Sequence, residues 1–557
     1  MDKDTTDSYT VTLGINGMFG EAWDYDASFT RNETKLKSRN FVRYADAVDG
    51  YFEKNVLGPQ LGEKEFFVDG ERLGLFPIYR PNYDAFFSTD MTPADLASFS
   101  GYGTAHAKTW DDLFRAQLTN TSLFSLPGGD AGLAVAVEAG NEGWDYQPIP
   151  GIMEGEIWGK SDVAGSAHRT RYAGMTELRL PVASMLSATV SGRYDAFDAY
   201  GTKVDKPTWS VGLEFRPIES LLIRGKYGTA FKAPTLPDQF QGESGFYSSV
   251  TDYYRCGQEG FTPADTLDCK YDSQQYAGLQ KGNPDLKPIT ADTWSIGAVW
   301  APTSNFSLGA DFYSWDIKNE VDQIGADDIM REEYYCRRGE AGPGIVSCDN
   351  VAAWISRDAS GQLVSIETPR VNVARQKLQL FTINTHYLQD IGRFGQLMFT
   401  ANYTNKTKHE RQPDVTQDYL DLLNSPNANW AYDAGPKWKA DGSIGWNIGK
   451  WTTTLYANMM GATPNYQAAI SDDWNYVDED YGVRAGKWGT YTTFNLGVDY
   501  QALDNLSLSL QVNNLGNKMP TNQAHNYPGT ETTPYNEYLY SVYGRSIFAE
   551  LHYNFGK

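Results

Sequence analysis

The chain of 557 residues is predicted to be all-β, an antiparallel transmembrane β-barrel of the outer-membrane type. Three observations predict this class: strands that alternate with period two, connections that are alternately short and long, and abundant aromatic residues. In NLSLSLQVNN (505–514), Leu506 and Leu508 alternate with Ser507 and Ser509. A β-strand shows this pattern when one face is apolar and the other polar. Recurrence along the whole chain favours a barrel with lipid outside and water inside.

Composition is consistent with a barrel and excludes some partners. No segment approaches the ~18 consecutive apolar residues of a transmembrane helix. The mean hydropathy of -0.50 is no objection, because a barrel strand gives only alternate residues to lipid. Aromatic residues make up 14% of the chain, as interfacial girdles and ligand-binding loops require. The net charge of -23 argues against a nucleic-acid partner, whose phosphates would be repelled.

The order of strands and turns predicts roughly 17 strands of about 10 residues each. Short connections contain turn formers such as Pro217, Pro302, Gly449 and Asp504. Long loops are expected at about 41–106, 233–290, 319–374, 408–436, 463–490 and 517–543. An odd count with the C-terminus on the short-turn side places the N-terminus on the loop side. A single-chain barrel normally has an even number of strands, so we expect the first strands to be missing from this chain.

Individual strands support a wet interior. In TWSVGLEFR (208–216), Trp209, Val211, Leu213 and Phe215 share one face, opposite Ser210, Gly212, Glu214 and Arg216. Charged residues on the polar faces are expected to line the interior, where they line a passage or form salt bridges with whatever fills it. The lumen charges expected in this way are Arg224, Lys226, Glu214, Asp311 and Asp499.

The four cysteines form two close pairs, Cys256 with Cys269 and Cys336 with Cys348. Each pair lies within one long polar segment and has no zinc-finger spacing. We therefore expect two local disulfides formed in an oxidising compartment, with free thiols as the alternative. The N-terminal MDKDTTDSYTVTL has no charged-then-apolar leader, so we expect the export signal upstream.

Five motifs resemble those of the TonB-dependent receptors, the gated outer-membrane importers of Gram-negative bacteria. YGTAFKAPTLPDQF (227–240) resembles the family's F-R-A-P box, with Lys232 in place of arginine, and GNPDLKPITADTW (282–294) resembles its N-P-x-L-K-P-E box, with Ile289 in place of the acid. LPGGDAGLAVAVEAG is similar to a mid-barrel turn and strand, and LQVNNLGNKMP (510–520) to the penultimate strand. The aromatic-ended last strand resembles the terminal signal for barrel assembly, although two residues follow the aromatic.

The resemblance implies a receptor that imports a scarce nutrient across the outer membrane, with no catalysis and no cofactor. Family members have a 22-stranded barrel filled by an N-terminal plug, on which the TonB–ExbB–ExbD energy complex pulls, driven by the proton-motive force. The implied partners are outer-membrane lipid, the plug with the early strands (from the same precursor or a separate chain), and a small-molecule or oligomeric nutrient. The plug, the TonB box and about five strands are expected to be absent from this chain.

The nutrient is expected to be a siderophore, an oligosaccharide or a peptide, bound at aromatic side chains of the loops. The candidate binding residues are Tyr79, Tyr83, Phe86, Phe87, Trp474, Tyr476 and Tyr481. For each of them, packing within its own loop is the alternative. The resemblance disfavours haem, because haem importers of this family use a histidine between the two boxes and none lies between Pro234 and Asn283 here. A metal is left undecided: acidic residues gather in the loop 463–490, but without the spacing of an EF-hand, which favours a solvated loop.

Three other functions are weighed against the receptor. An ungated outer-membrane pore, or a structural barrel that pairs with a separate plug or strand segment, is the main alternative. An outer-membrane enzyme is disfavoured, because His552 and Glu550 share a strand face with no serine partner that the sequence identifies. A soluble carbohydrate-binding protein is disfavoured by the large apolar faces it would expose to water.

Overall fold

The computed structural model describes the chain except for residues 1, 21, 69–70, 89, 426–427, 429–434, 466–472, 478–483, 521–538, 542 and 556–557. Over the described residues, one antiparallel sheet contains seventeen long strands and one two-residue strand, β21 (Leu420–Asp421). The long strands are β1 (Lys3–Phe19), β2 (Trp23–Arg43), β5 (Ser100–Asn120), β8 (Gly132–Gln147), β9 (Gly165–Ala183), β10 (Leu186–Ala199), β11 (Thr202–Ile218), β12 (Leu221–Lys232), β15 (Ile289–Thr303), β16 (Phe306–Gln323), β19 (Arg370–Asp390), β20 (Gln396–Gln412), β22 (Trp438–Ile448), β23 (Trp451–Met460), β26 (Tyr491–Leu503), β27 (Leu506–Asn513) and β28 (Ser546–Tyr553). The predicted fold class and strand number are confirmed.

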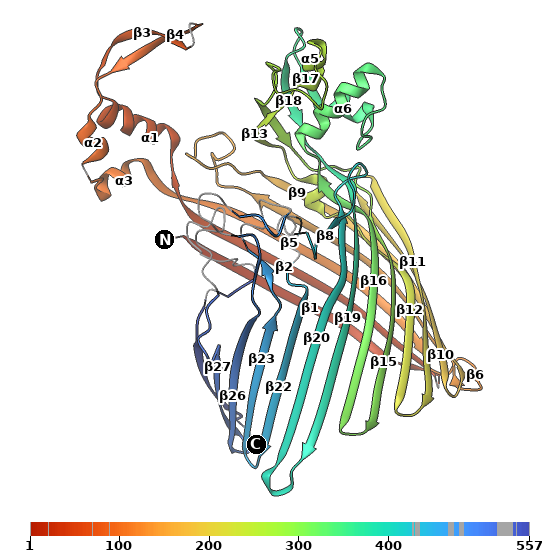
Figure 1. Cartoon of the computed structure of the whole chain (residues 1–557). Helices are drawn as coiled ribbons and strands as arrows, with labels where there is room; N and C mark the ends of the chain where they lie inside the picture. Colours follow the sequence, from red (N-terminus) through yellow and green to blue (C-terminus); the bar gives the residue numbers. More distant parts are fainter. Residues whose placement is uncertain are drawn as a thin grey trace.

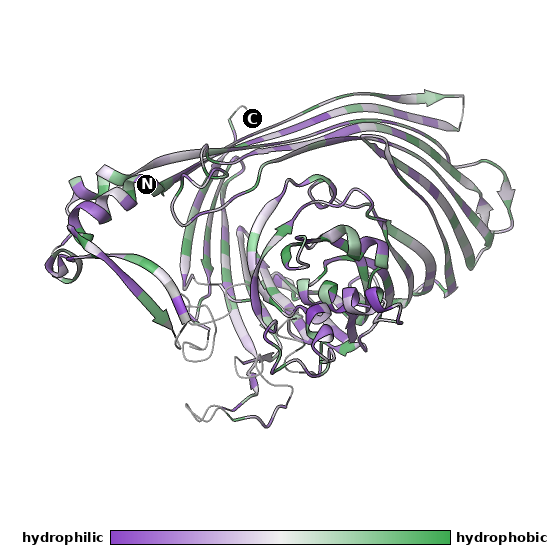
Figure 2. Ribbon diagram, turned by 90° about the horizontal axis from the view of Figure 1, so that it is seen from above, coloured by the Kyte–Doolittle hydropathy of each residue, from purple (hydrophilic) through white to green (hydrophobic). Residues whose placement is uncertain are grey.

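Each long strand pairs with the next along the chain, and the sheet curves around an interior (Figures 1 and 2). Most connections at one end are tight turns. The turn between β5 and β8 contains the small hairpin of β6 (Ser125–Leu126) and β7 (Gly129–Asp130), and that between β19 and β20 contains the 3-10 turn η2 (Gly392–Phe394). Most connections at the opposite end are long, but β10 and β11 are joined there by Tyr200 and Gly201 alone. The predicted alternation of connections is therefore wrong at this position.

The strands are longer than the sequence predicted. β2, β5 and β19 have 21 residues each, about twice the length needed to cross a bilayer. Their extra residues lie at the loop end, where apolar and polar residues no longer alternate regularly. Without regular alternation the amphipathic signal is lost, so these stretches read as loops in the sequence.

One face of the sheet carries the exposed apolar side chains. On β11, Trp209, Val211, Leu213 and Phe215 are each 37–52% exposed. Residues directly opposite one another on paired strands share a face, and Val211 lies opposite Val190 of β10. The same face continues around the sheet as exposed Leu13, Phe29, Phe114, Val137, Tyr172, Tyr227, Ile296, Ile383, Ile444, Leu455, Phe494, Leu510 and Ile547. We call this band the apolar belt. Exposing it to water would be costly, so it is expected to contact lipid.

The sheet has two open edges. Among the described residues, β1 pairs only with β2 and β28 pairs only with β27. All fourteen side chains from Lys3 to Asn16 are exposed. Unpaired backbone groups at such an edge need partners if the edge lies in lipid.

A compact subdomain, here called the cap, lies at the loop end over the interior (Figures 1 and 2). Two segments far apart in the sequence form it. The first comprises β13 (Ser244–Val250), α5 (Tyr253–Gln258) and β14 (Gln274–Gln280); the second comprises α6 (Ala326–Arg338), α7 (Cys348–Trp354), β17 (Ile355–Arg357) and β18 (Leu363–Glu367). The four strands pair in the order β13-β14-β18-β17, and β14 and β18 run parallel. The cap has its own apolar core, which contains Ile329, Met330 and Ile366.

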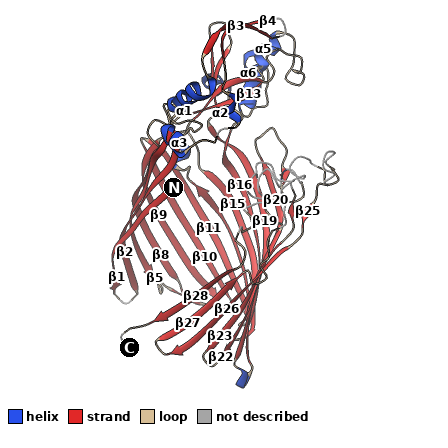
Figure 3. Cartoon of the chain, turned by 90° about the vertical axis from the view of Figure 1, so that its left-hand side faces the viewer, coloured by secondary structure: helices blue, strands red, loops and turns tan. Residues whose placement is uncertain are grey.

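A second feature, here called the arm, projects from the loop end beside the cap (Figures 1 and 3). It comprises α1 (Ala45–Phe52), the π-helical turn η1 (Glu53–Leu57), the hairpin of β3 (Gln60–Val68) and β4 (Glu71–Tyr79), α2 (Tyr83–Phe87) and α3 (Pro93–Phe99). Two minor elements complete the described fold: α4 (Leu236–Phe240), and the pair β24 (Thr463–Pro464) with β25 (Lys487–Trp488). No described helix has the length and apolar character needed to cross a membrane.

Candidate functional site

Ion pairs cover the interior side of β5, β8 and β9. Arg169 and Arg171 alternate on β9 and therefore share a face. Arg169 Nε donates to Glu142 Oε1 at 2.6 Å, and Arg171 Nη2 donates to Asp111 Oδ1 at 2.8 Å. Charged groups placed this close on a half-exposed wall are mutually compensated and limit one another's motion. These residues are not among the lumen charges expected from the sequence, although the alternation in HRTR (168–171) could have indicated them.

Arg193 of β10 continues the network. Its guanidinium donates to Asp195 Oδ1 at 2.6 Å and to Glu138 Oε2 at 2.8 Å. Arg193 Nη1 also contacts Met175 Sδ at 3.3 Å. The interior wall therefore presents fixed charges of both signs.

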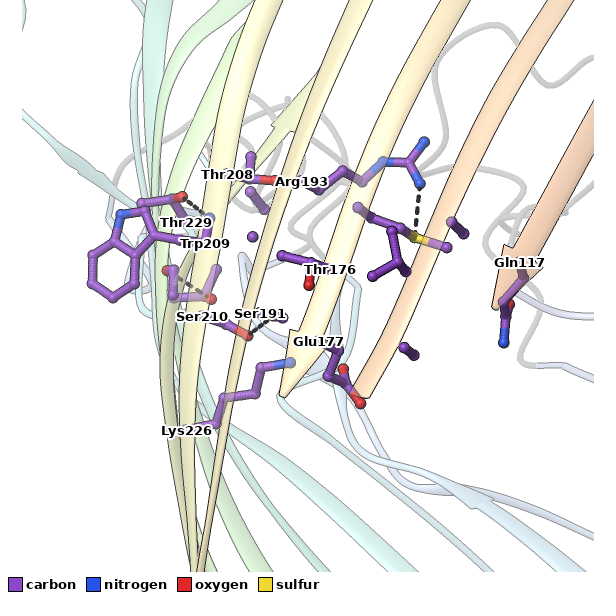
Figure 4. Close-up of a pocket in the computed structure, with 18 residues that line it drawn as sticks. Gln117, Thr176, Glu177, Ser191, Arg193, Thr208, Trp209, Ser210, Lys226 and Thr229 are labelled. Atoms are coloured by element: carbon purple, nitrogen blue, oxygen red, sulfur yellow. Dashed lines mark hydrogen bonds between the residues drawn. The ribbon is translucent and has the colours of Figure 1, made fainter. Parts of the chain in front are cut away.

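Two neighbouring cavities are hollowed into this wall. The lower one, of about 470 Å³, includes Glu177, Ser191, Arg193, Ser210 and Lys226 in its lining (Figure 4). The upper one, of about 590 Å³, adds Phe197, Phe231 and Lys232 to the arginines. Lys232 is exposed and forms no ion pair with a described residue, so its ammonium is available to a ligand. Mixed charges with two phenyl rings suit a polar ligand that has an aromatic or apolar part.

The two sequence boxes that resemble family motifs meet at the top of the wall. The first motif (227–240) contains Thr235, whose side chain caps α4 in a capping box with Asp238. Asn283 of the second box donates from its backbone to Asp238 O at 2.8 Å, and Gln239 Nε2 donates to Pro284 O at 3.2 Å. Gln239 and Pro284 are 45 residues apart along the chain. In this structure the two boxes therefore join two loops at the rim of the barrel wall.

The predicted lumen charges have different partners. Arg224 of β12 forms a two-pronged pair with Asp311 of β16, at 2.9 Å to each carboxylate oxygen. Asp499 accepts a hydrogen bond from Ser509 at 2.5 Å. Glu214 and Lys226 line the same cavity as Arg224, which places them on the interior side.

The predicted binding aromatics lie on two separate loops. Tyr79, Tyr83 and Phe87 belong to the arm; Tyr83 and Phe87 are 65% and 74% exposed, with stacked rings. Trp474 and the half-buried Tyr476 belong to the loop between β23 and β26, and Trp474 Nε1 donates at 2.8 Å to Asn424 O of the loop between β20 and β22. No contact between the two sets is present in the described parts of these loops. Phe86 lies in α2 with its side chain undescribed, and Tyr481 lies outside the described residues. Their role in binding stays a prediction.

A buried ion-pair cluster joins the two segments of the cap. Arg357 Nη1 donates to Asp252 Oδ2 at 2.7 Å, and Arg357 Nη2 donates to Glu333 Oε2 at 2.5 Å. The side chains of Arg357, Asp252 and Glu333 are only 7%, 0% and 4% exposed. Arg337 also donates to Glu333. Because the pair spans 105 residues of sequence, it fixes one loop to the other.

The predicted disulfides are present, and both are local. Cys256 pairs with Cys269 in the first cap segment and Cys336 with Cys348 in the second, with no free cysteine in the chain. Loops of 13 and 12 residues should each add about 3 kcal/mol to local stability. We expect reduction to increase proteolysis within each segment while the two segments stay associated through Arg357 and the β14–β18 pairing. Limited trypsin digestion with and without reductant would measure this; separation of the segments on reduction would contradict it.

One cap carboxylate gives the cap a pH dependence. Hydrogen bonds from Thr251 at 2.6 Å, Thr266 at 3.1 Å and Ser273 at 3.2 Å lower the pKa of Asp272. A carboxyl whose folded pKa is lowered stabilises the fold above its ordinary pKa of about 4, and the contribution is lost as the pH falls below that value. We expect Thr251→Val to reduce the loss of cap stability between about pH 5 and pH 3, measured by hydrogen exchange; an unchanged profile would contradict this.

Together these features define a class: a transmembrane barrel wall with an apolar exterior, an ion-paired interior and a cap over its mouth. The family model described as "TonB dependent receptor-like, beta-barrel" matches residues 1–515. The chain belongs to this family, which consists of receptors and transporters rather than enzymes.

Solved structures share the fold at low sequence identity. The siderophore receptor PirA from Acinetobacter baumannii has 14% identity and a TM-score of 0.57, with 99% of this chain and 62% of that chain covered. A variant of the ferric enterobactin receptor PfeA from Pseudomonas aeruginosa, solved with enterobactin, has 16% identity and a TM-score of 0.56, with the same coverage of 99% and 62%. The ferric-catecholate import receptor Fiu from K12 E. coli has 12% identity and a TM-score of 0.50, covering 93% and 61%. No curated protein matches the chain by sequence.

Proposed function

We propose that the chain forms the C-terminal part of the 22-stranded barrel of an outer-membrane nutrient receptor. The chain spans about three fifths of the length of the receptors it resembles, 62% of PirA. Missing strands would pair with the open edges of β1 and β28, and a plug would fill the interior. The observation that carries this proposal is the two-sided wall: an apolar belt faces one way, while ion pairs and cavities face the other under a cap.

The nutrient proposed for this receptor is a siderophore, with an oligosaccharide or a peptide as the other candidates. Siderophore receptors are among the similar structures, which supports the first. The upper cavity offers Lys232 for an anionic group and Phe197 with Phe231 for a ring. Import would draw on the proton-motive force through a TonB-type complex that acts on the plug.

Uptake by cells tests this function. Cells with and without the receptor would be given radiolabelled ferric enterobactin, a mixed oligosaccharide pool and a mixed peptide pool. We expect one of these to accumulate only in cells with the receptor and to stop accumulating when a protonophore is added. Accumulation that persists with the protonophore, together with ion conductance of the purified protein, would instead indicate an ungated pore.

Lys232 provides a residue-level check on the same assay. Loss of a hydrogen bond to a charged group costs about 1.5–3 kcal/mol, so Lys232→Gln should raise the half-saturating nutrient concentration roughly tenfold or more. Lys203→Gln, an exposed lysine on the exterior face of β11, is the matched control and should have no effect. If Lys232→Gln and Lys203→Gln have the same half-saturating nutrient concentration, the upper cavity is not part of the binding site.

A further inference from the structure

The exterior face of β1, β2 and β5 changes character abruptly above the apolar belt. Phe29 of β2 lies opposite Phe114 of β5, and both rings are exposed. The next exterior pair toward the loop end is Arg31 opposite Asp112, and from there charged residues are interspersed with Val11, Tyr9 and Trp110 on the same face. These strands lie side by side in the sheet (Figure 3). The charged face therefore begins within one strand repeat of the surface expected to contact lipid.

Cations dominate this face. Counting alternate residues above Phe29 and their opposites on β1 and β5, the exterior carries seven cations and three carboxylates, a net charge of +4 in a chain whose total is -23. The cations, here called the basic patch, are Lys3, Arg31, Lys35, Lys37, Arg39, Arg43 and Lys108; the carboxylates are Asp7, Glu33 and Asp112.

Five strands farther around the sheet are acidic at the same level of the wall. The exterior of β10, β11, β12, β15 and β16, up to Lys318, carries four carboxylates and two lysines, a net charge of -2. The residues are Asp198, Asp205, Asp292 and Asp316 with Lys203 and Lys318. The basic patch is therefore not continued on these strands, although the exterior of β19 and β20 beyond them again carries more cations than carboxylates: Arg375, Lys377 and Lys408 with Glu410.

A buried carboxylate organises the centre of the patch. Lys35 lies directly opposite Lys108, an arrangement that is unfavourable for like charges. Glu33, whose side chain is 4% exposed, accepts from Arg31 at 2.7 Å, from Lys35 at 2.9 Å and from Lys108 at 3.3 Å. Glu33 thus holds the charged groups of Arg31, Lys35 and Lys108 in place without a ligand.

Lys37 and Arg39 form the uncompensated part of the patch. Neither forms an ion pair with a described residue. The Arg39 guanidinium lies over the Tyr102 ring at 3.8 Å, which fixes its plane while leaving its outer N–H groups exposed. Arginine and lysine side chains placed together in this way suit phosphate oxygens.

We propose that the basic patch binds the phosphate-bearing headgroup of a lipid in the leaflet on the loop side. The lower end of the patch, at Arg31, lies directly above the apolar belt, so the acyl chains would contact Phe29, Phe114 and Leu13. The phosphates of the headgroup would then lie along the cations that extend from Arg31 to Lys37 and Arg39. Neighbouring strands are about 4.8 Å apart, so cations of three strands can contact one headgroup. This inference rests on the proposed placement in an outer membrane and is independent of the nutrient.

The test uses the receptor as extracted from cells in neutral detergent, with lipid binding measured by native mass spectrometry. The probes are bis-phosphorylated lipid A, the same lipid without phosphates, and inorganic phosphate as a competitor. Each cation near a headgroup contributes about a five-fold change in affinity, so Lys37→Gln with Arg39→Gln should weaken binding of the phosphorylated lipid roughly 25-fold. Both residues lie outside the Glu33 cluster, so the variant should fold.

Two variants and two readouts separate the outcomes. Lys203→Gln with Lys318→Gln removes two exterior lysines from the acidic side and should leave lipid binding unchanged, and Lys37→Arg with Arg39→Lys should retain it. The proposal is overturned if the wild type binds both lipids equally, if the two glutamine variants lose binding equally, or if inorganic phosphate displaces the lipid. Nutrient uptake is measured in parallel: its failure with intact lipid selectivity would count against the receptor function alone.

Discussion

Arg357→Met is expected to destabilise the cap by about 3–5 kcal/mol, because it leaves two carboxylates buried without a counter-charge. Asp252 and Glu333 are both almost fully buried and both accept from the Arg357 guanidinium. The hydrogen bond from Tyr253 to Asp327 and the pairing of β14 with β18 also join the two cap segments, but neither buries a charged group as deeply. The loss would appear as faster hydrogen exchange in residues 244–280 and 326–367, with the barrel strands unaffected.

Arg338 provides the control for this prediction. It also pairs with a carboxylate, Glu340, but both side chains are about half exposed, at 48% and 45%. Exposed pairs contribute about 0–1 kcal/mol, so Arg338→Met should change cap exchange little. If the two variants behave alike, the Arg357 cluster does not join the cap segments.

Val211→Lys is expected to destabilise the folded barrel in a bilayer by about 2–4 kcal/mol, the cost of a lysine near the middle of the lipid face. Val211 lies between Trp209 and Leu213 on the exterior of β11. The neighbouring residue Ser210 faces the interior, where its hydroxyl lies 2.7 Å from that of Ser191 and it lines the lower cavity. Ser210→Lys is therefore the matched control and should be tolerated.

Denaturant titration of the receptor folded into phosphatidylcholine vesicles would compare the two lysine variants. A shift in midpoint for Val211→Lys with little shift for Ser210→Lys is the expected result. The prediction is wrong if the interior variant is the more destabilised, because the two faces would then be assigned the wrong way round.

Local sequence patterns predicted the features that depend on residues close together in the chain. The alternation in residues 208–216 gave the two faces of β11 correctly, and the short spacings of the cysteines gave both disulfides. Strand length was underestimated because residues such as Arg31 to Arg39 are charged on the exterior above the belt.

Long-range pairings could not be predicted in this way. The cap depends on Arg357 meeting Asp252 across 105 residues and on parallel pairing of β14 with β18, neither of which leaves a local pattern. The interior network was missed because Arg171 and Asp111 become neighbours only when β5, β8 and β9 assemble. The candidate aromatics were chosen by composition, and the structure places them on separate loops.

The central claim is that lipid contacts one face of each strand while water contacts the other. A nitroxide label at each position from 208 to 216, in the receptor reconstituted into phosphatidylcholine, tests it most directly through collision rates with oxygen and with a water-soluble nickel chelate. We expect oxygen collisions to peak at 209, 211, 213 and 215, and nickel collisions at 210, 212 and 214. Protection of the odd-numbered positions from both reagents would mean that they meet in a dry core, and would contradict the account.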